Sequence, residues 1–329
     1  MNKKLKLQTK LICPLHKSEL TMDSDNSRYI CKSGCTYPIV NNIPRFVAQN
    51  SYADSFGLQW NTYKQTQLDS FTKTTISQDR LKRMLMGSFE LLQGKDVLEA
   101  GCGAGRFTEI LLQNGANVIS ADLSAAVEAN YDNCKSYENY FICQADILNL
   151  PVNPEAFDLV ICIGVIQHTP NPENTIKALI SHVKPGGLLV IDHYTKGYPE
   201  TPSRKILRAF LLRRSPQFSM AFIRGLTNAL WPIHKILGSR RQTSWIKKGR
   251  SLFLYISPLV DYHDAYPQLS KEQLKTWAML DTHDTLTDHY KHIRTSAEIQ
   301  DHLIKCGMEN IHIAVAGNGI EVIAKKAII

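Results

Sequence analysis

Short apolar runs alternate with stretches of helical periodicity through the middle of the chain. The run Phe157–Gly164 is almost wholly apolar, which is typical of a strand buried on both faces of a parallel sheet. Helices between such strands are needed to cover both faces of the sheet. The pattern therefore predicts an α/β fold. The expected strands are 96–98, 118–122, 140–145, 157–164 and 188–194, and the expected helices between them are 107–113, 124–138 and 173–183.

The flanks of this region carry their own signals. Thr295 and Glu298 form a capping box, which predicts the start of a helix that stops at Gly307. The other expected elements are a helix over 77–94, a turn at 184–187, and an antiparallel strand pair over 311–316 and 319–325.

A glycine-rich loop directly follows the first strand of the α/β region. Glycine occupies every second position, at Gly101, Gly103 and Gly105, and a helix begins at once. Glycines let the backbone approach a ligand, and the helix N-terminus offers free N–H groups. The next strand ends in Asp122, where an acid can accept both hydroxyls of a ribose. The spacing is not the G-x-G-x-x-G of a dinucleotide site, and the preceding acid Glu99 suits an amine better than a phosphate. These residues predict a nucleoside-containing cofactor.

This arrangement resembles motif I of the class I S-adenosylmethionine-dependent methyltransferases. The resemblance implies a Rossmann-like α/β fold, with a doubly wound, mostly parallel seven-stranded sheet whose last strand is antiparallel. It implies that Glu99 faces the methionine amine of S-adenosyl-L-methionine, that Asp122 holds the ribose, and that Asp146 lies near the adenine amine. Four strand ends would then converge on one crevice. The expected cofactor-binding residues are Glu99, Gly101, Gly103, Gly105, Arg106, Asp122, Leu123, Asp146, Ile147, Ile163 and Gly164.

An aromatic stretch before the glycine loop allows two interpretations. Tyr52, Trp60 and Tyr63 either join the core at the sheet edge or fold over the cofactor, as the segment before the motif often does in the resembling family.

Two pairs of metal-ligating residues lie near the amino end, Cys13 with His16 and Cys31 with Cys35. Three thiolates and one imidazole are a suitable ligand set for tetrahedral zinc, and a site closed by four protein ligands is structural. The segment resembles the zinc-binding domain of the small activator subunits of methyltransferases, with His16 in place of their second cysteine. Metal-free loop thiols are the alternative.

Composition places few limits on the function. The chain has 329 residues, of which 43% are hydrophobic and 21% charged, and no run approaches the ~20 apolar residues of a membrane span. The basic start is followed by polar residues and Cys13 instead of the apolar core of a signal peptide. The eight cysteines are scattered. We therefore expect reduced thiols and a cytoplasmic protein, either free or peripheral to the membrane.

The positive charge is concentrated in one segment. Residues 201–260 contain twelve Lys or Arg and no Asp or Glu, so the remainder of the chain carries 8 − 12 = −4. Apolar residues recur there at helical spacing, with Arg213, Arg214, Arg240 and Arg241 among the cations. The bland interpretation is core packing with a solvated charged face. The alternative is that the basic insertion, 204–250, binds a phosphorylated substrate, an anionic membrane surface or RNA.

These signals divide the chain into four expected parts. They are a zinc-binding domain (1–48), a connecting segment with a helix (49–94), an S-adenosylmethionine-binding methyltransferase domain (95–197 and 291–329), and a helical basic insertion that covers the substrate (198–290).

The function expected from the resemblance is methyl transfer to a small molecule with an anionic or lipid-like handle, such as a sugar, a glycan-lipid or a quinone precursor. RNA methylation and a non-catalytic S-adenosylmethionine-binding or scaffold role are the alternatives. If the acceptor loses a proton, a neutral histidine is the usual base. His168, four residues after its strand, is the first candidate, followed by His193 and His283. Alternatively, His168 only hydrogen-bonds the loop before Pro170, and no base is needed.

Overall fold

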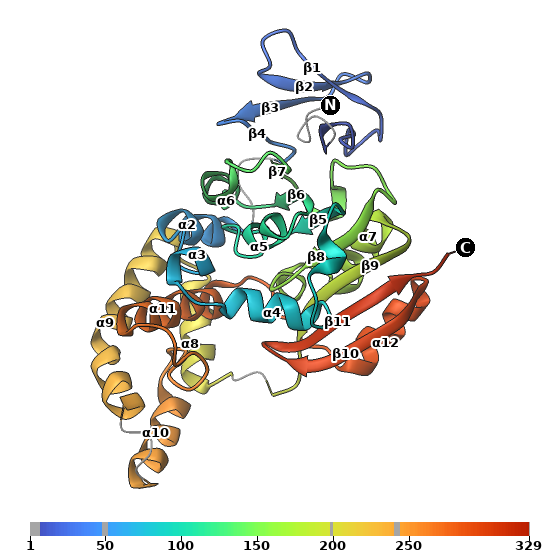
Figure 1. Cartoon of the computed structure of the whole chain (residues 1–329). Helices are drawn as coiled ribbons and strands as arrows, with labels where there is room; N and C mark the ends of the chain where they lie inside the picture. The colour runs from blue at the N-terminus through green and yellow to red at the C-terminus, as the bar shows by residue number, and fades with distance from the viewer. Residues whose placement is uncertain (1–6, 48–51, 198–199, 240–243, 329) are drawn as a thin grey trace.

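The structure is a computed structural model that describes residues 7–47, 52–197, 200–239 and 244–328. Arg240 and Arg241 of the basic insertion lie outside these residues. A seven-stranded sheet forms the centre, in the order β10-β11-β9-β8-β5-β6-β7 (Figure 1). Its strands are β5 (Asp96–Ala100), β6 (Asn117–Asp122), β7 (Tyr140–Gln144), β8 (Phe157–Cys162), β9 (Val183–Tyr194), β10 (Met308–Ala316) and β11 (Gly319–Lys326).

Five strands of this sheet, β5 to β9, run parallel, and the last strand β11 runs antiparallel to β9. Alternate strand residues serve two separate cores. Leu98 packs on the face covered by α7 and α12, whereas Val97 packs on the face covered by α4 and α5. Helices thus cover both faces, and the predicted doubly wound α/β fold is confirmed. The covering helices are α4 (Ile76–Met84), α5 (Thr108–Gln113), α6 (Val127–Cys134), α7 (Pro172–His182) and α12 (Ser296–Lys305).

Two of the expected boundaries are wrong. The helix expected to reach Gly94 ends at Met84, because Met86 and Gly87 adopt left-handed backbone conformations and only a short 3-10 turn, η1 (Glu90–Leu92), follows. The segment expected as a turn at 184–187 belongs to β9 instead. The pairing of β8 with β9 jumps from Val183 to Leu188, so these residues form a bulge within the strand.

The amino-terminal segment forms a small antiparallel sheet against the edge of the large one. Its strands are β1 (Leu20–Met22), β2 (Arg28–Cys31), β3 (Thr36–Val40) and β4 (Ile43–Pro44). The N–H of Phe46 donates to the carbonyl of Gln144 at 2.8 Å, beside a bridge between Arg45 and Gln144. Tyr29 and Tyr37 are buried in the same core as Leu98. The four-part domain division itself stays a prediction.

The insertion after β9 is helical, as predicted. It contains α8 (Pro202–Leu211), α9 (Pro216–Ser239), α10 (Ser244–Ile256) and α11 (Lys271–Thr287), which extend to one side of the sheet domain (Figure 1). The segment before the glycine loop adds α2 (Asp54–Thr62) and α3 (Asp69–Thr72), and α11 packs against α2, α8 and α9. Within the described ranges, no helix combines the length and apolar character needed to cross a bilayer.

Candidate functional site

The glycine loop lies between β5 and α5 and takes a shape that only glycines tolerate. Gly101, Gly103 and Gly105 all have positive φ, at 75°, 50° and 98°. A Cβ on Gly101 would also lie 2.3 Å from a methyl carbon of Val165. The loop therefore exposes backbone without side chains at the end of the sheet. The indole of Trp60 lies close to Gly103 in this loop.

The carboxylate of Asp122 holds this loop in place from the end of β6. One oxygen accepts the N–H of Gly103 at 2.9 Å, and the other accepts the N–H and hydroxyl of Ser124 at 2.8 and 2.7 Å. Burial raises the pKa of Asp122 above its ordinary value. Because each carboxylate oxygen has two lone pairs, the group retains acceptor capacity for further hydroxyls.

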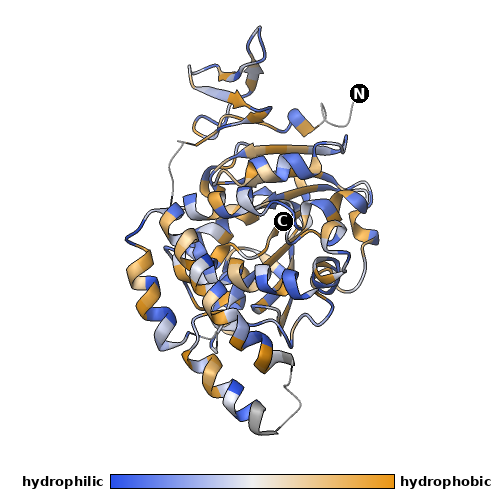
Figure 2. Ribbon diagram, turned by 90° about the vertical axis from the view of Figure 1, so that its left-hand side faces the viewer, coloured by the Kyte–Doolittle hydropathy of each residue, from blue (hydrophilic) through white to orange (hydrophobic). Residues whose placement is uncertain are grey.

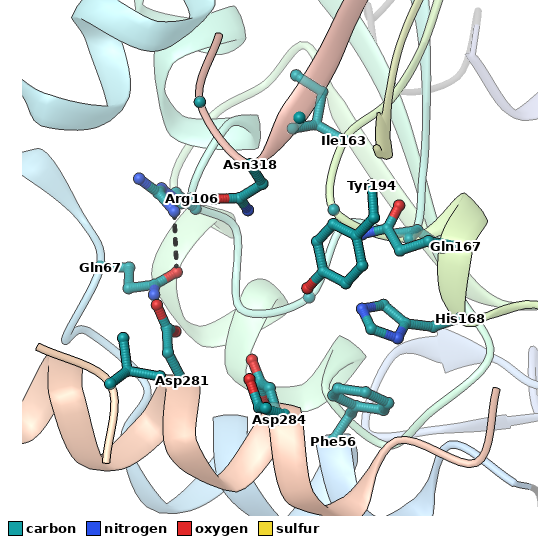
Figure 3. A pocket seen from close by; sticks show the side chains of 18 of the residues that line it. Phe56, Gln67, Arg106, Ile163, Gln167, His168, Tyr194, Asp281, Asp284 and Asn318 are labelled. Atoms are coloured by element: carbon teal, nitrogen blue, oxygen red, sulfur yellow. Dashed lines mark hydrogen bonds between the residues drawn. The ribbon is translucent and has the colours of Figure 1, made fainter. Parts of the chain in front are cut away.

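A cavity of about 890 Å³ lies above the ends of the parallel strands and under the insertion. Figure 3 shows side chains from opposite walls, His168 and Tyr194 on one and Arg106 with Asp281 on another. Its volume falls in the upper range of small-molecule sites. Of the predicted cofactor residues, those on the wall are Gly101, Gly103, Arg106, Asp122, Leu123, Asp146, Ile147, Ile163 and Gly164.

Two predicted cofactor residues, Glu99 and Gly105, do not line this cavity. The Glu99 side chain is turned toward α5, where it accepts the hydroxyls of Thr108 and, at 3.1 Å, Ser120. Glu99 is only 3% exposed, and burial raises the pKa of its carboxyl group to about 7. The expected direct contact with an amine is therefore at odds with this arrangement. Gly105 lies behind the loop, with a Cβ position 3.3 Å from the thiol of Cys134.

Arg106 lines the cavity and has one donor without a partner among the described residues. Its Nε donates to the hydroxyl of Ser77 at 2.8 Å, and one terminal nitrogen donates to the Gln67 side chain at 3.3 Å (Figure 3). The guanidinium lies between the rings of Phe107 and Trp277, 5.2 and 5.3 Å from their centres. The other terminal nitrogen is buried and has no hydrogen-bond partner among the described residues. A buried donor in this state favours an acceptor from a ligand.

Of the three histidines proposed as base, only His168 lines the cavity. Its Nδ1 lies 3.1 Å from the carbonyl oxygen of Tyr290 and 3.3 Å from a carboxylate oxygen of buried Asp288. A carbonyl only accepts, so Nδ1 carries the proton and Nε2 of the neutral ring is an acceptor. The rings of Phe56 and Tyr194 flank the imidazole, with centres 5.8 and 5.3 Å away. This tautomer is the one a general base needs.

The two other histidines are held away from the cavity. Nδ1 of His193 contacts the carbonyl of Tyr194 at 2.8 Å, and burial lowers the pKa of His193. His283 lies 2.5 Å from the side-chain oxygen of Gln59, and burial lowers its pKa to about 4. Neither histidine lines the cavity, so His168 is the one of the three candidate bases that the structure favours.

Several cavity residues were missed by the sequence reasoning. Asp281 and Asp284, three residues apart on α11, point into the cavity (Figure 3), and burial raises the pKa of both. Their spacing on one helix face was the available signal. Of the aromatic stretch, Tyr52 and Trp60 line the cavity, whereas the hydroxyl of Tyr63 lies against the sulfur of Met279.

The four predicted zinc ligands meet at one point of the amino-terminal sheet. Their ligand atoms all lie within 4.8 Å of one another. Nδ1 of His16 is 3.6 Å from the sulfur of Cys13 and 3.5 Å from those of Cys31 and Cys35. Tetrahedral bonds of about 2.3 Å to sulfur and about 2.0–2.1 Å to nitrogen would separate such atoms by about 3.5 Å. The donor set thus fits zinc in both chemistry and spacing.

Residues 98–191 match the family model of a methyltransferase domain. This region of the chain is therefore similar to a methyltransferase domain. A ubiquinone biosynthesis O-methyltransferase of Coxiella burnetii is 33% identical over 110 residues, which are 32% of this chain and 47% of the relative. Its counterpart in Pseudomonas fluorescens is 38% identical over 100 residues, 29% and 43% of the two chains. The chain thus spans about half the length of these relatives.

Solved structures with a similar arrangement include the CurJ carbon methyltransferase, at 14% identity and a TM-score of 0.45, covering 82% of this chain and 59% of that one. They also include magnesium protoporphyrin IX methyltransferase from Synechocystis with bound S-adenosylmethionine, at 14% identity and a TM-score of 0.40. The coverage there is 77% of this chain and 78% of the other.

Proposed function

We propose that this protein transfers a methyl group from S-adenosyl-L-methionine to a hydroxyl or amine of a small molecule. The observation that carries the proposal is that the glycine loop, Asp122 and Asp146 line the same cavity as His168. The proposed cofactor site and a histidine tautomer that can accept a proton therefore lie in the same cavity. The match of residues 98–191 to a methyltransferase domain supports the same reaction.

The cavity residues have complementary tasks in this proposal. S-adenosylmethionine, when bound, supplies a methyl group activated by a sulfonium cation. Asp122 accepts the ribose hydroxyls of the cofactor. The terminal nitrogen of Arg106 that has no partner among the described residues donates to a carboxylate of the bound ligand. His168 takes the proton that the acceptor loses through Nε2, while Tyr290 and Asp288 hold the ring through Nδ1. The enclosed walls exclude water and align the acceptor.

The substrate class we favour has an anionic or lipid-like handle, and a quinone precursor is one member of it. The support is the likeness of the domain to two ubiquinone biosynthesis O-methyltransferases, together with the cationic insertion over the cavity. RNA is the alternative acceptor that the same cations would suit.

Cofactor binding is tested by calorimetry on the full chain with S-adenosylmethionine and S-adenosylhomocysteine. Asp122→Ala should weaken both by about 2–4 kcal/mol, because two charge-assisted hydrogen bonds are lost. NADH serves as the negative ligand. Equal affinity in wild type and variant would refute the assignment of Asp122.

The acceptor is sought by incubating the enzyme with methyl-labelled S-adenosylmethionine and separate fractions of lipids, small metabolites and RNA. In the fraction that gains label, His168→Gln should lower kcat about a hundredfold or more with cofactor affinity unchanged. The acidic limb of the pH–rate profile should also disappear in this variant. His312→Gln, an exposed histidine on β10, is the matched control. Near-normal kcat in His168→Gln would exclude the histidine as base.

We also propose that Cys13, His16, Cys31 and Cys35 hold one structural zinc ion. The support is the spacing of their ligand atoms, and four protein ligands complete a tetrahedral site. Elemental analysis of protein purified without chelator should give one zinc per chain, and Cys31→Ser should lower that content. Protein that is folded and free of zinc would end the proposal.

A further inference from the structure

The turn between α8 and α9 places aromatic and cationic side chains together on the surface. The rings of Phe210, Phe218 and Phe222 lie with their centres 6.1–6.2 Å apart. The guanidinium of Arg214 stacks over two of them, 4.7 Å from Phe210 and 5.7 Å from Phe218. Phe210 is 38% exposed and Phe218 44%. We call this region the aromatic tip, defined by Ile206, Phe210, Arg213, Arg214, Phe218 and Phe222.

Helix α8 turns two arginines inward and leaves part of its apolar surface exposed. Its arginines face inward, where Arg204 donates to the carbonyls of Pro258 and Leu259, and Arg208 pairs with buried Asp288 at 2.7 Å. Of its apolar side chains, Leu211 and Leu207 pack inward, whereas Ile206 and Phe210 face outward, with Ile206 71% exposed. An exposed apolar face bordered by cations is typical of a contact surface and unfavourable in plain water.

Lys205, Arg208 and Arg250 of the insertion pair with acids from outside residues 201–260, whereas within the described ranges the arginines of the aromatic tip do not. Residues 201–260 contain no acid, and among the described residues no carboxylate forms an ion pair with Arg213 or Arg214. Figure 2 shows apolar residues recurring along the insertion helices at the bottom of the molecule. The complementary partner therefore offers negative charge and an apolar layer side by side.

We propose that the aromatic tip docks onto the surface of an anionic lipid bilayer. The exposed rings of Phe210 and Phe218 and the side chain of Ile206 would enter the boundary between headgroups and acyl chains, and Arg213 and Arg214 would contact lipid phosphates. RNA would use the arginines but gives no reason for an exposed isoleucine beside them. A second copy of the tip would bring like charges together, because the tip contains no acid.

Docking in this way would bring the cavity close to the bilayer. Thr201 and Arg204, at the start of α8, line the cavity. At 1.5 Å per helical residue, Phe210 lies about 14 Å beyond Thr201 along the same helix. A substrate with a lipid-like handle could then pass from the bilayer to His168 without crossing bulk water. This consequence for substrate access rests on the proposed function, whereas bilayer binding does not.

The test is co-sedimentation of the full chain with vesicles of phosphatidylcholine containing about 30% phosphatidylglycerol, against phosphatidylcholine alone. Binding should require the anionic lipid and fall steeply between about 50 and 500 mM salt. Replacing both Arg213 and Arg214 with Ser should weaken binding about thirtyfold, from two lost surface cations. Ile206→Ser with Phe210→Ser should weaken it about tenfold or more, with a smaller change in salt dependence.

The matched control is Ile304→Ser with Lys305→Ser on α12, an exposed apolar and cationic pair far from the tip. It should bind vesicles as the wild type does. Calorimetry with S-adenosylmethionine on every variant verifies folding and separates a failure of docking from a failure of the methyltransferase assignment. No vesicle binding at low salt, tip variants that bind normally, tighter binding to RNA than to vesicles, or a dimer that the tip variants abolish would each overturn the proposal.

Discussion

Replacing Glu99 with Gln should remove a penalty that the fold carries at neutral pH. The carboxyl group is buried beneath the glycine loop, and its described partners are the hydroxyls of Thr108 and Ser120. Burial raises its pKa from 4.5 to about 7. Between these values the unfolded chain has released the proton and the folded chain still holds it. Stability from this group is therefore fully present below pH 4.5 and is lost as pH rises through 7.

The size of the effect follows from the shift. A change of about 2.5 pKa units, at 1.36 kcal/mol each, corresponds to about 3 kcal/mol of unfolding free energy lost between pH 4 and pH 8. Glu99→Gln cannot titrate, so the difference between wild type and variant should change by this amount over that range. Any constant cost of the altered hydrogen bonds cancels in the comparison.

The assay is urea unfolding of cofactor-free wild type and Glu99→Gln at several pH values from 4 to 8. The variant should gain relative stability with rising pH. A matched control is Glu109→Gln, a partly exposed acid on α5. A difference that stays constant within about 0.5 kcal/mol would show that Glu99 titrates normally and that its burial is not felt.

Three further predictions use other parts of the structure. Gly101→Ala should abolish cofactor binding in calorimetry and destabilise the fold by about 1–3 kcal/mol, because its Cβ would overlap Val165 at a left-handed backbone position. Arg80→Met should cost about 3–5 kcal/mol in urea unfolding, since it leaves buried Asp192 without its ion pair. A strong zinc chelator should unfold residues 1–48 first, visible as loss of amide protection there while the methyltransferase domain retains its own.

Local patterns predicted the fold and most of the named residues that line the cavity. The buried parallel strands are readable because both faces require apolar side chains, and Asp122 is readable because it follows such a strand. What the sequence could not provide was side-chain direction. Glu99 precedes the glycine loop as predicted, but its side chain turns toward α5. The hydrogen-bond partners of Arg106 are Gln67 and Ser77, which lie many residues earlier in the chain. Such contacts depend on packing between distant segments.

The insertion was the least predictable part for a related reason. Its amphipathic stripe gave helices but not their faces, and α8 buries two arginines while exposing Ile206. Asp288, the buried carboxylate that pairs with Arg208, lies eighty residues further along the chain. Only the assembled fold shows that these arginines hold the helix while Ile206 and Phe210 stay exposed.

The contact between the small sheet and β7 has a consequence for solubility. β7 is the outermost strand on its side of the seven-stranded sheet, and an outermost strand presents unpaired backbone groups that can recruit another chain. Arg45 and Phe46 pair with it at Gln144, so the segment that carries the zinc ligands also shields this open edge. Removing that segment would leave a five-residue strand, Tyr140–Gln144, free to template aggregation. The amino-terminal sheet thus protects the catalytic domain from self-association whether or not it contacts any substrate.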